Sequence, residues 1–202
     1  MTAKFTKRRK IVAAITGVSV LVAGGIIVLF VNRGPDDKFA VSSCANHVSH
    51  LKTDLWNFAE TATNFPTETD TRKAFFAMGS SAERLASLAC PEAFFKYGSI
   101  GYVFIGDGLP TKLAEETGAL LLFCPADSHQ RSQQHSHAVV LDHSMGCVMS
   151  NAEMMALLSR ALQCAKDGVI PYSTNAVARM RQELDARRAH EDRRRGIKDK
   201  GV

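Results

Sequence analysis

Side chains that bind transition metals gather between residues 124 and 147. Imidazole and thiolate groups are the ligands that zinc and copper favour, and methionine sulfur also suits copper. Their spacing here matches no closed motif, such as paired CxxC units. The candidate metal ligands are His129, His135, His137, His143, Cys124 and Cys147. One hypothesis is therefore a membrane-tethered copper-binding, zinc-binding or thiol-redox protein.

The competing hypothesis uses no metal. Residues 126–137 then form a solvated polar loop, and Cys124 and Cys147 either pack in adjacent strands or form a disulfide. Met145 and Met149 flank the same hairpin, but core packing is the commoner use of this flexible apolar side chain. Because short patterns often arise by chance, we expect no cofactor and keep copper or zinc as the alternative.

Signatures of catalysis are missing from the sequence. It has no Gly-x-Ser-x-Gly, Walker A, His-Glu-x-x-His or dinucleotide fingerprint. A nucleophile pair of Cys147 with His143 lacks a third group to orient the base. We therefore expect no enzymatic activity and name no catalytic residue.

An uncharged, mostly apolar run, Ile11–Val31, determines on which side of a membrane the other residues lie. About 20 apolar residues in a helix cross a hydrocarbon core of about 30 Å. Residues 1–10 carry five positive charges and no negative one, so the positive-inside rule places them in the cytoplasm. We expect a single-pass signal-anchor in the inner membrane of a bacterium, with an extracytoplasmic (periplasmic) domain. Cleavage after the small residues 23–25 is the alternative.

Charge and cysteine content constrain the domain further. The formal charge of the chain is +5, residues 1–10 carry +5 and the tail from Arg179 carries +4, so residues 11–178 carry −4. A mildly acidic folded part argues against nucleic-acid binding. Five cysteines outside the cytoplasm permit disulfides, but their spacing leaves the connectivity open.

Apolar periodicity predicts an α+β domain over residues 43–172, after a linker over 32–42. Helices are expected near 43–62 and 71–89, the second interrupted before a capping box at Ser80–Glu83. Further expected elements are a strand at 100–105, a helix at 111–117, a strand at 119–124, a hairpin of 138–141 with 145–149, and a helix opened by Ser150–Glu153. Together the strands make a small antiparallel sheet.

The last segment, residues 173–202, is rich in charge. Glu183–Arg187 and Glu191–Arg195 are four-residue pairs in the favourable order, which indicates a solvated, salt-bridged helix. Contact of this basic tail with an anionic polymer or an envelope protein is the functional alternative.

The order of features from Tyr102 to Met149 resembles the C-terminal module of bacterial prepilin-like proteins. A Tyr-Val-rich strand is followed by a histidine-containing loop and a hairpin around Asp142, where that family has Asp-Gly. Here His143 replaces the glycine, and the N-terminus lacks the prepilin processing signal. The resemblance implies a membrane-anchored β-sheet domain of structural or interaction role that does not polymerise, and it implies no reaction.

Overall fold

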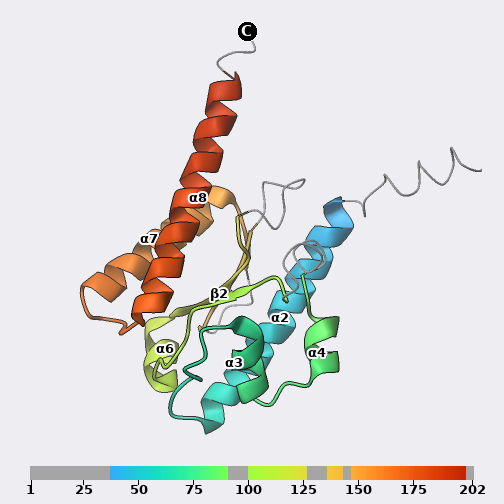
Figure 1. Ribbon diagram of the computed structural model, residues 1–202, viewed down its shortest axis with the longest axis vertical. Helices are drawn as coiled ribbons and strands as arrows, with labels where there is room; N and C mark the ends of the chain where they lie inside the picture. The colour runs from blue at the N-terminus through green and yellow to red at the C-terminus, as the bar shows by residue number, and fades with distance from the viewer. Residues whose placement is uncertain (1–36, 91–99, 127–135, 143–146, 199–202) are drawn as a thin grey trace, which may run out of the picture. The chain divides into compact units, whose positions relative to one another are not determined.

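The computed structural model describes residues 37–90, 100–126, 136–142 and 147–198, which form an α+β domain (Figure 1). The helices are α2 (Asp37–Thr61), α3 (Thr71–Ala77), α4 (Ala82–Ser87), α6 (Thr111–Thr117), α7 (Asn151–Lys166) and α8 (Thr174–Lys198). The strands are β1 (Val103–Phe104), β2 (Leu120–Phe123), β3 (Ser136–Val140) and β4 (Cys147–Met149). They form one antiparallel sheet in the order β1-β2-β3-β4. The expected fold class and small sheet are confirmed.

Several expected boundaries move by a few residues. The helix α2 begins at Asp37, inside the segment expected as linker 32–42. The N-cap of α4 is Ser81, whose side chain accepts a hydrogen bond from the Arg84 amide, so the expected cap at Ser80 is one residue early. In contrast, the capping box of Ser150 and Glu153 is present in full at the start of α7. α6 ends at Gly118, whose φ of 61° suits a residue without a side chain.

The hairpin is confirmed, but it starts earlier than expected. β3 begins at Ser136, so His137 is a strand residue and not part of a solvated loop. Cys124 directly follows β2, whereas Cys147 opens β4, and β3 lies between those two strands. The prediction that Cys124 and Cys147 lie in adjacent strands is therefore wrong. A single short run of apolar residues could not show which strand occupies the centre of the sheet.

The two faces of the sheet carry different side chains. Every residue of β2 is buried, so both faces are covered. Val103 lies opposite Phe123 and Phe104 lies opposite Leu122, and directly opposed residues share a face. Figure 1 shows α7 and α8 together on one side of the strands and α2 with α3 and α4 on the other. Tyr102 and Cys124 contact Cys44 of α2, and Phe104 packs against Phe75 of α3, whereas Val103 and Phe123 line a cleft together with residues of α8.

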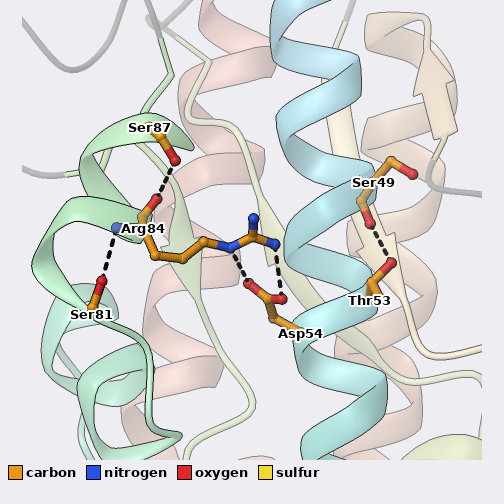
Figure 2. A network of polar contacts seen from close by, with 6 residues as sticks. All are labelled: Ser49, Thr53, Asp54, Ser81, Arg84 and Ser87. Carbon is orange, nitrogen blue, oxygen red and sulfur yellow. Dashed lines mark hydrogen bonds and ion pairs between the residues drawn. The ribbon is translucent and has the colours of Figure 1, made fainter.

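Contacts between α2 and α4 fix the helical layer, as Figure 2 shows. Arg84 binds both carboxylate oxygens of Asp54, at 3.3 Å through Nε and 3.1 Å through Nη2. The Ser81 hydroxyl caps the first turn of α4, and the Ser87 hydroxyl donates to the Arg84 carbonyl at 2.7 Å. An exposed ion pair of this kind contributes little stability, but its two-pronged geometry orients α4 along α2. The chain just after α4 also lies against α2, where His47 donates to the Ala89 carbonyl at 3.0 Å.

The charged C-terminal helix is part of the domain. α8 packs along α7 and buries Ala176, Met180 and Leu184. The expected pair of Glu183 with Arg187 is present at 2.7 Å, but their side chains are only 10% and 3% exposed. The expectation of a solvated helix is therefore wrong for this stretch, since the pair is enclosed by the elements that α8 covers.

Among the described residues, no helix combines the length and the apolar character that a membrane span requires. The expected membrane segment, residues 11–31, lies outside the described residues.

Candidate metal centre

Three buried thiols and one buried imidazole meet beneath α2. The Sγ atom of Cys44 lies 3.6 Å from that of Cys124 and 3.9 Å from that of Cys90. The Cys124 Sγ lies 3.9 Å from Nδ1 of His137. The ligand atoms of Cys44, Cys124 and His137 are all within 4.8 Å of one another. We call Cys44, Cys90, Cys124 and His137 the thiol cluster.

These separations match the edges of a tetrahedral metal site. With zinc–sulfur bonds of about 2.3 Å, two sulfur ligands stand about 3.8 Å apart, and a sulfur and a nitrogen ligand about 3.6 Å apart. The distances from Cys44 to the other two sulfurs, 3.6 and 3.9 Å, bracket that sulfur–sulfur value. Cys44 therefore holds its sulfur at coordination spacing from the sulfurs of Cys90 and Cys124, and the His137 ring nitrogen lies within 4.8 Å of the sulfurs of Cys44 and Cys124.

Helix contacts bring Cys44 and Cys90 together, although they are far apart in the sequence. His47 lies one turn after Cys44 on α2, and its Nδ1 donates to the carbonyl oxygen of Ala89 at 3.0 Å. The next residue is Cys90, whose amide donates to the carbonyl of Ile100 at 2.9 Å. The Cys90 backbone is thus held between α2 and the chain that leads into β1.

The sheet ladder positions the other two ligands. The Cys124 amide donates to the His137 carbonyl at 2.9 Å, which makes the two residues a directly opposed pair. Opposed side chains in an antiparallel pair point to the same face, so the thiol and the imidazole both project toward α2. Sequence alone could not show this, because it does not reveal the register in which β2 pairs with β3.

Tyr102 supports the cluster from β1. Its hydroxyl lies 3.4 Å from the Cys44 sulfur. Thr71 fixes the backbone on either side of this tyrosine, because its hydroxyl donates to the Tyr102 carbonyl at 2.9 Å and accepts from the Phe104 amide at 3.0 Å. A phenol held there can donate a hydrogen bond to a thiolate, which is how outer groups tune a metal's ligands.

A buried arginine binds the end of β2 and the start of β3, beside the thiol cluster. Arg187 donates through Nη2 to the Cys124 carbonyl at 2.8 Å and through Nη1 to the Ser136 hydroxyl at 2.6 Å. The same Nη1 reaches Asn151 Oδ1 at 2.8 Å, while Nε pairs with Glu183 at 2.7 Å. We call this set the Arg187 network. It holds the main-chain carbonyl of Cys124 and the side chain of Ser136, the residue before His137.

Burial determines the protonation of the cluster. Desolvation and the neighbouring thiols raise the pKa of the Cys124 thiol well above its usual range. Cys124 lowers the pKa of Cys44 by hydrogen bonding, but Cys90 and burial outweigh it, so the Cys44 pKa is also raised. Burial likewise raises the pKa of the Tyr102 phenol. Without a cation these groups are neutral at pH 7 and make poor nucleophiles, because the thiolate is the reactive form.

Binding of a soft divalent or monovalent cation would favour the deprotonated thiolates over the neutral thiols. Metal binding replaces the thiol protons, so thiolates form only where a cation compensates their charge. Cys44, Cys124 and Cys164 are free thiols, and the Cys90 sulfur lies 3.9 Å from that of Cys44, too far for a disulfide between them. Cys164, half-buried on α7, is not among the residues that form the cluster.

The structure brings together two of the six expected ligands. Cys124 and His137 belong to the cluster, whereas His129, His135 and His143 lie outside the described residues. The backbone of Cys147 pairs with Ala138 in β4. Asp142, at the turn of the hairpin, forms an ion pair with Lys52 of α2 at 3.0 Å. Cys44 and Cys90 were not among the expected ligands, because they precede the histidine-rich stretch and only the fold brings them to it.

Comparison of the chain with family models, with curated proteins and with solved structures found no match.

Proposed function

We propose that this chain is a membrane-anchored zinc protein, with the thiol cluster as its metal site. In this proposal the apolar segment 11–31 anchors the chain, and the domain behind it lies on the extracytoplasmic side. Zinc is bound by Cys44, Cys124 and His137, with Cys90 as the fourth ligand. The metal stabilises the domain and has no catalytic task, because a closed site with four protein ligands leaves no position for substrate.

The observation that carries this proposal is the convergence of four buried ligand side chains from four separate parts of the fold. Cys44 comes from α2, Cys90 follows α4, Cys124 follows β2 and His137 belongs to β3. Buried cysteines are common in cores as small apolar residues. Two thiols and an imidazole within 4.8 Å of one another, with a third thiol 3.9 Å from one of them, are a more specific arrangement, because tetrahedral sulfur and nitrogen ligation is typical of zinc.

The expected location adds a second argument. Outside the cytoplasm, neighbouring thiols tend to be oxidised to disulfides, yet the sulfurs of Cys44 and Cys124 lie 3.6 Å apart as free thiols. A bound metal protects thiolates from oxidation by occupying their lone pairs. The predicted compartment and the reduced cluster are compatible if a metal is present.

A thiol-redox protein is the runner-up, and the site supports it less well. Exchange requires an accessible thiolate with a depressed pKa. Cys44, Cys90 and Cys124 are all completely buried, and the pKa values of Cys44 and Cys124 are raised.

The metal content of the purified full chain tests the proposal. The chain is extracted in a non-ionic detergent without chelator, and zinc per chain is measured by plasma mass spectrometry. We expect about one zinc per chain in the unaltered protein, and a loss of most of it in Cys124→Ser. Cys164→Ser is the matched control, because this thiol is half-buried and not among the cluster residues. Absence of zinc, or retention of full zinc in Cys124→Ser, would contradict the site.

Because Cys124→Ser removes a core side chain, folding must be followed separately. Circular dichroism at low temperature reports whether the helices are retained. Cys44→Ser provides a second loss-of-ligand variant on a different element.

A further inference from the structure

A pocket of about 360 Å³ lies between α7 and the sheet. Leu120 of β2 and Val140 of β3 line it from directly opposed positions, which share a face of the sheet. Successive side chains of a strand point to opposite faces, so Ala138 and Val140 face away from the side on which His137 joins the thiol cluster. No residue of the thiol cluster lines this pocket. It is therefore a candidate binding site that the metal proposal does not use.

One face of α7 forms the opposite wall. The helix residues that line the pocket recur at three- and four-residue intervals, and they are Leu157, Arg160, Ala161 and Cys164. Arg160 and Cys164 are four residues apart, so their Cβ atoms lie about 6 Å from each other on the helix surface. The guanidinium group and the thiol can therefore contact the same small ligand.

The interior of the pocket is mostly apolar. Ile170 and Tyr172, between α7 and α8, are buried and line it, and the Tyr172 hydroxyl is already bound to the Leu120 carbonyl at 3.0 Å. Burial raises the pKa of the Tyr172 phenol, and the neighbouring Cys164 thiol adds to this shift. An apolar interior with a few polar groups is the usual composition of a small-molecule site, and a volume of this size is within the usual range.

The charged groups of the pocket leave one positive charge. The ammonium group of Lys52 binds the Asp142 carboxylate at 3.0 Å, so these two charges compensate each other. Arg160 is exposed and makes no ion pair with any residue that the structure describes. A guanidinium group can bind a carboxylate through two parallel hydrogen bonds. The pocket therefore suits a ligand with a single negative charge.

We propose that this pocket binds a small organic acid, with its carboxylate on Arg160 and its apolar body against Leu157 and Cys164. The proposal does not depend on zinc, because the metal ligands and the lining residues are different side chains.

Protection of Cys164 from alkylation tests the site, with 4-phenylbutyrate as the probe. The full chain in non-ionic detergent reacts with iodoacetamide, and peptide mass spectrometry follows the alkylation of Cys164. At ten times its dissociation constant the probe leaves about a tenth of the sites empty, so Cys164 should react about tenfold more slowly. Acetate, which has the carboxylate without the apolar body, should give no protection.

A reference thiol on the same helix controls for effects on the reagent. Ser159→Cys places an exposed thiol on α7 that does not line the pocket, and its alkylation rate should not change. Trypsin cleaves after Arg160, so the reference thiol and Cys164 are found in separate peptides.

The neutral amide 4-phenylbutanamide isolates the contribution of Arg160. Free probe is measured after ultrafiltration, because detergent micelles take up the neutral compound. We expect the acid to bind about fivefold more tightly than the amide, as for an exposed ion pair of good geometry. Arg160→Gln should abolish this preference. Lys166→Gln, which removes another exposed cation of α7 outside the pocket, should keep it.

Three results would overturn the proposal. The first is no protection of Cys164 by 4-phenylbutyrate at millimolar concentration, or equal protection of the reference thiol or by acetate. The second is equal affinity for the acid and the amide. The third is a preference that survives Arg160→Gln or is lost equally in Lys166→Gln, with circular dichroism showing that both variants are folded. None of these results bears on the zinc content.

Discussion

The thiol cluster and the Arg187 network both involve the end of β2 and the start of β3. They differ in how fully their buried polar groups are paired with other groups of the chain. Arg187 carries a charge into the interior and meets Glu183, Ser136, Asn151 and the Cys124 carbonyl at 2.6–2.8 Å. The cluster groups meet one another at 3.6–3.9 Å, with only weak sulfur hydrogen bonds between them. In the Arg187 network, other groups of the chain supply the partners of the buried charges. We infer that in the thiol cluster a bound cation supplies them.

The largest effect is expected from breaking the Arg187 network. Arg187→Met leaves Glu183 buried without its cation, and such a loss costs about 3–5 kcal/mol. Urea unfolding of the chelator-treated protein, followed by circular dichroism, measures it. Arg188→Met, an exposed arginine that lies 3.8 Å from Asp185, should change the unfolding free energy by less than about 0.5 kcal/mol.

The double change Glu183→Met/Arg187→Met refines this prediction. Replacing both charges by apolar side chains should recover most of the loss, since the orphaned carboxylate is then absent. If Arg187→Met alone costs less than about 1 kcal/mol, the network is not the complete buried system described above.

Metal binding should give the next largest effect. Zinc in 1,000-fold excess over its dissociation constant raises the free energy of unfolding by about 4 kcal/mol, since only the folded chain has the site. Thermal unfolding before and after chelation measures the gain. Cys124→Ser should lose this response, and Cys164→Ser should retain it. An equal response of both variants would mean that zinc acts elsewhere.

Two buried tyrosines give a smaller contrast. Tyr172 donates to the Leu120 carbonyl at 3.0 Å, whereas the Tyr102 hydroxyl contacts sulfur at 3.4 Å. In chelated protein, Tyr172→Phe should cost about 1 kcal/mol, the usual net value of a buried hydrogen bond, and Tyr102→Phe should cost less. Zinc affinity should fall in Tyr102→Phe and stay constant in Tyr172→Phe, because only Tyr102 can donate to a metal-bound thiolate. Denaturant curves and zinc titrations distinguish the two.

The smallest effect concerns the cap of α7. The Ser150 amide donates to the Glu153 carboxylate at 2.6 Å and lowers its pKa from the usual 4.5. A lowered pKa in the folded state contributes stability above pH 4.5, and the contribution disappears as the pH falls through the folded value. Glu153→Gln should therefore lower stability slightly at pH 7 and not at strongly acidic pH. A substitution effect that does not depend on pH would contradict this assignment.

The comparison also shows what the sequence could and could not reveal. Local signals were reliable, as at the Ser150–Glu153 capping box and at Gly118, because they depend on residues within one turn. Cys124 and His137 were identified by residue type. Cys44 and Cys90 were not, because only α2 and α4 bring them to the sheet. The four-residue spacing predicted that Arg187 pairs with Glu183. It could not predict that the pair is buried, because the burial comes from contacts of α8 with α7, β2 and β3.

X-ray absorption at the zinc edge of the purified full chain identifies the atoms that bind the metal. We expect three sulfur ligands at about 2.3 Å and one nitrogen at about 2.0 Å. A shell of nitrogen and oxygen ligands alone would contradict it, because the metal would then lie outside the thiol cluster.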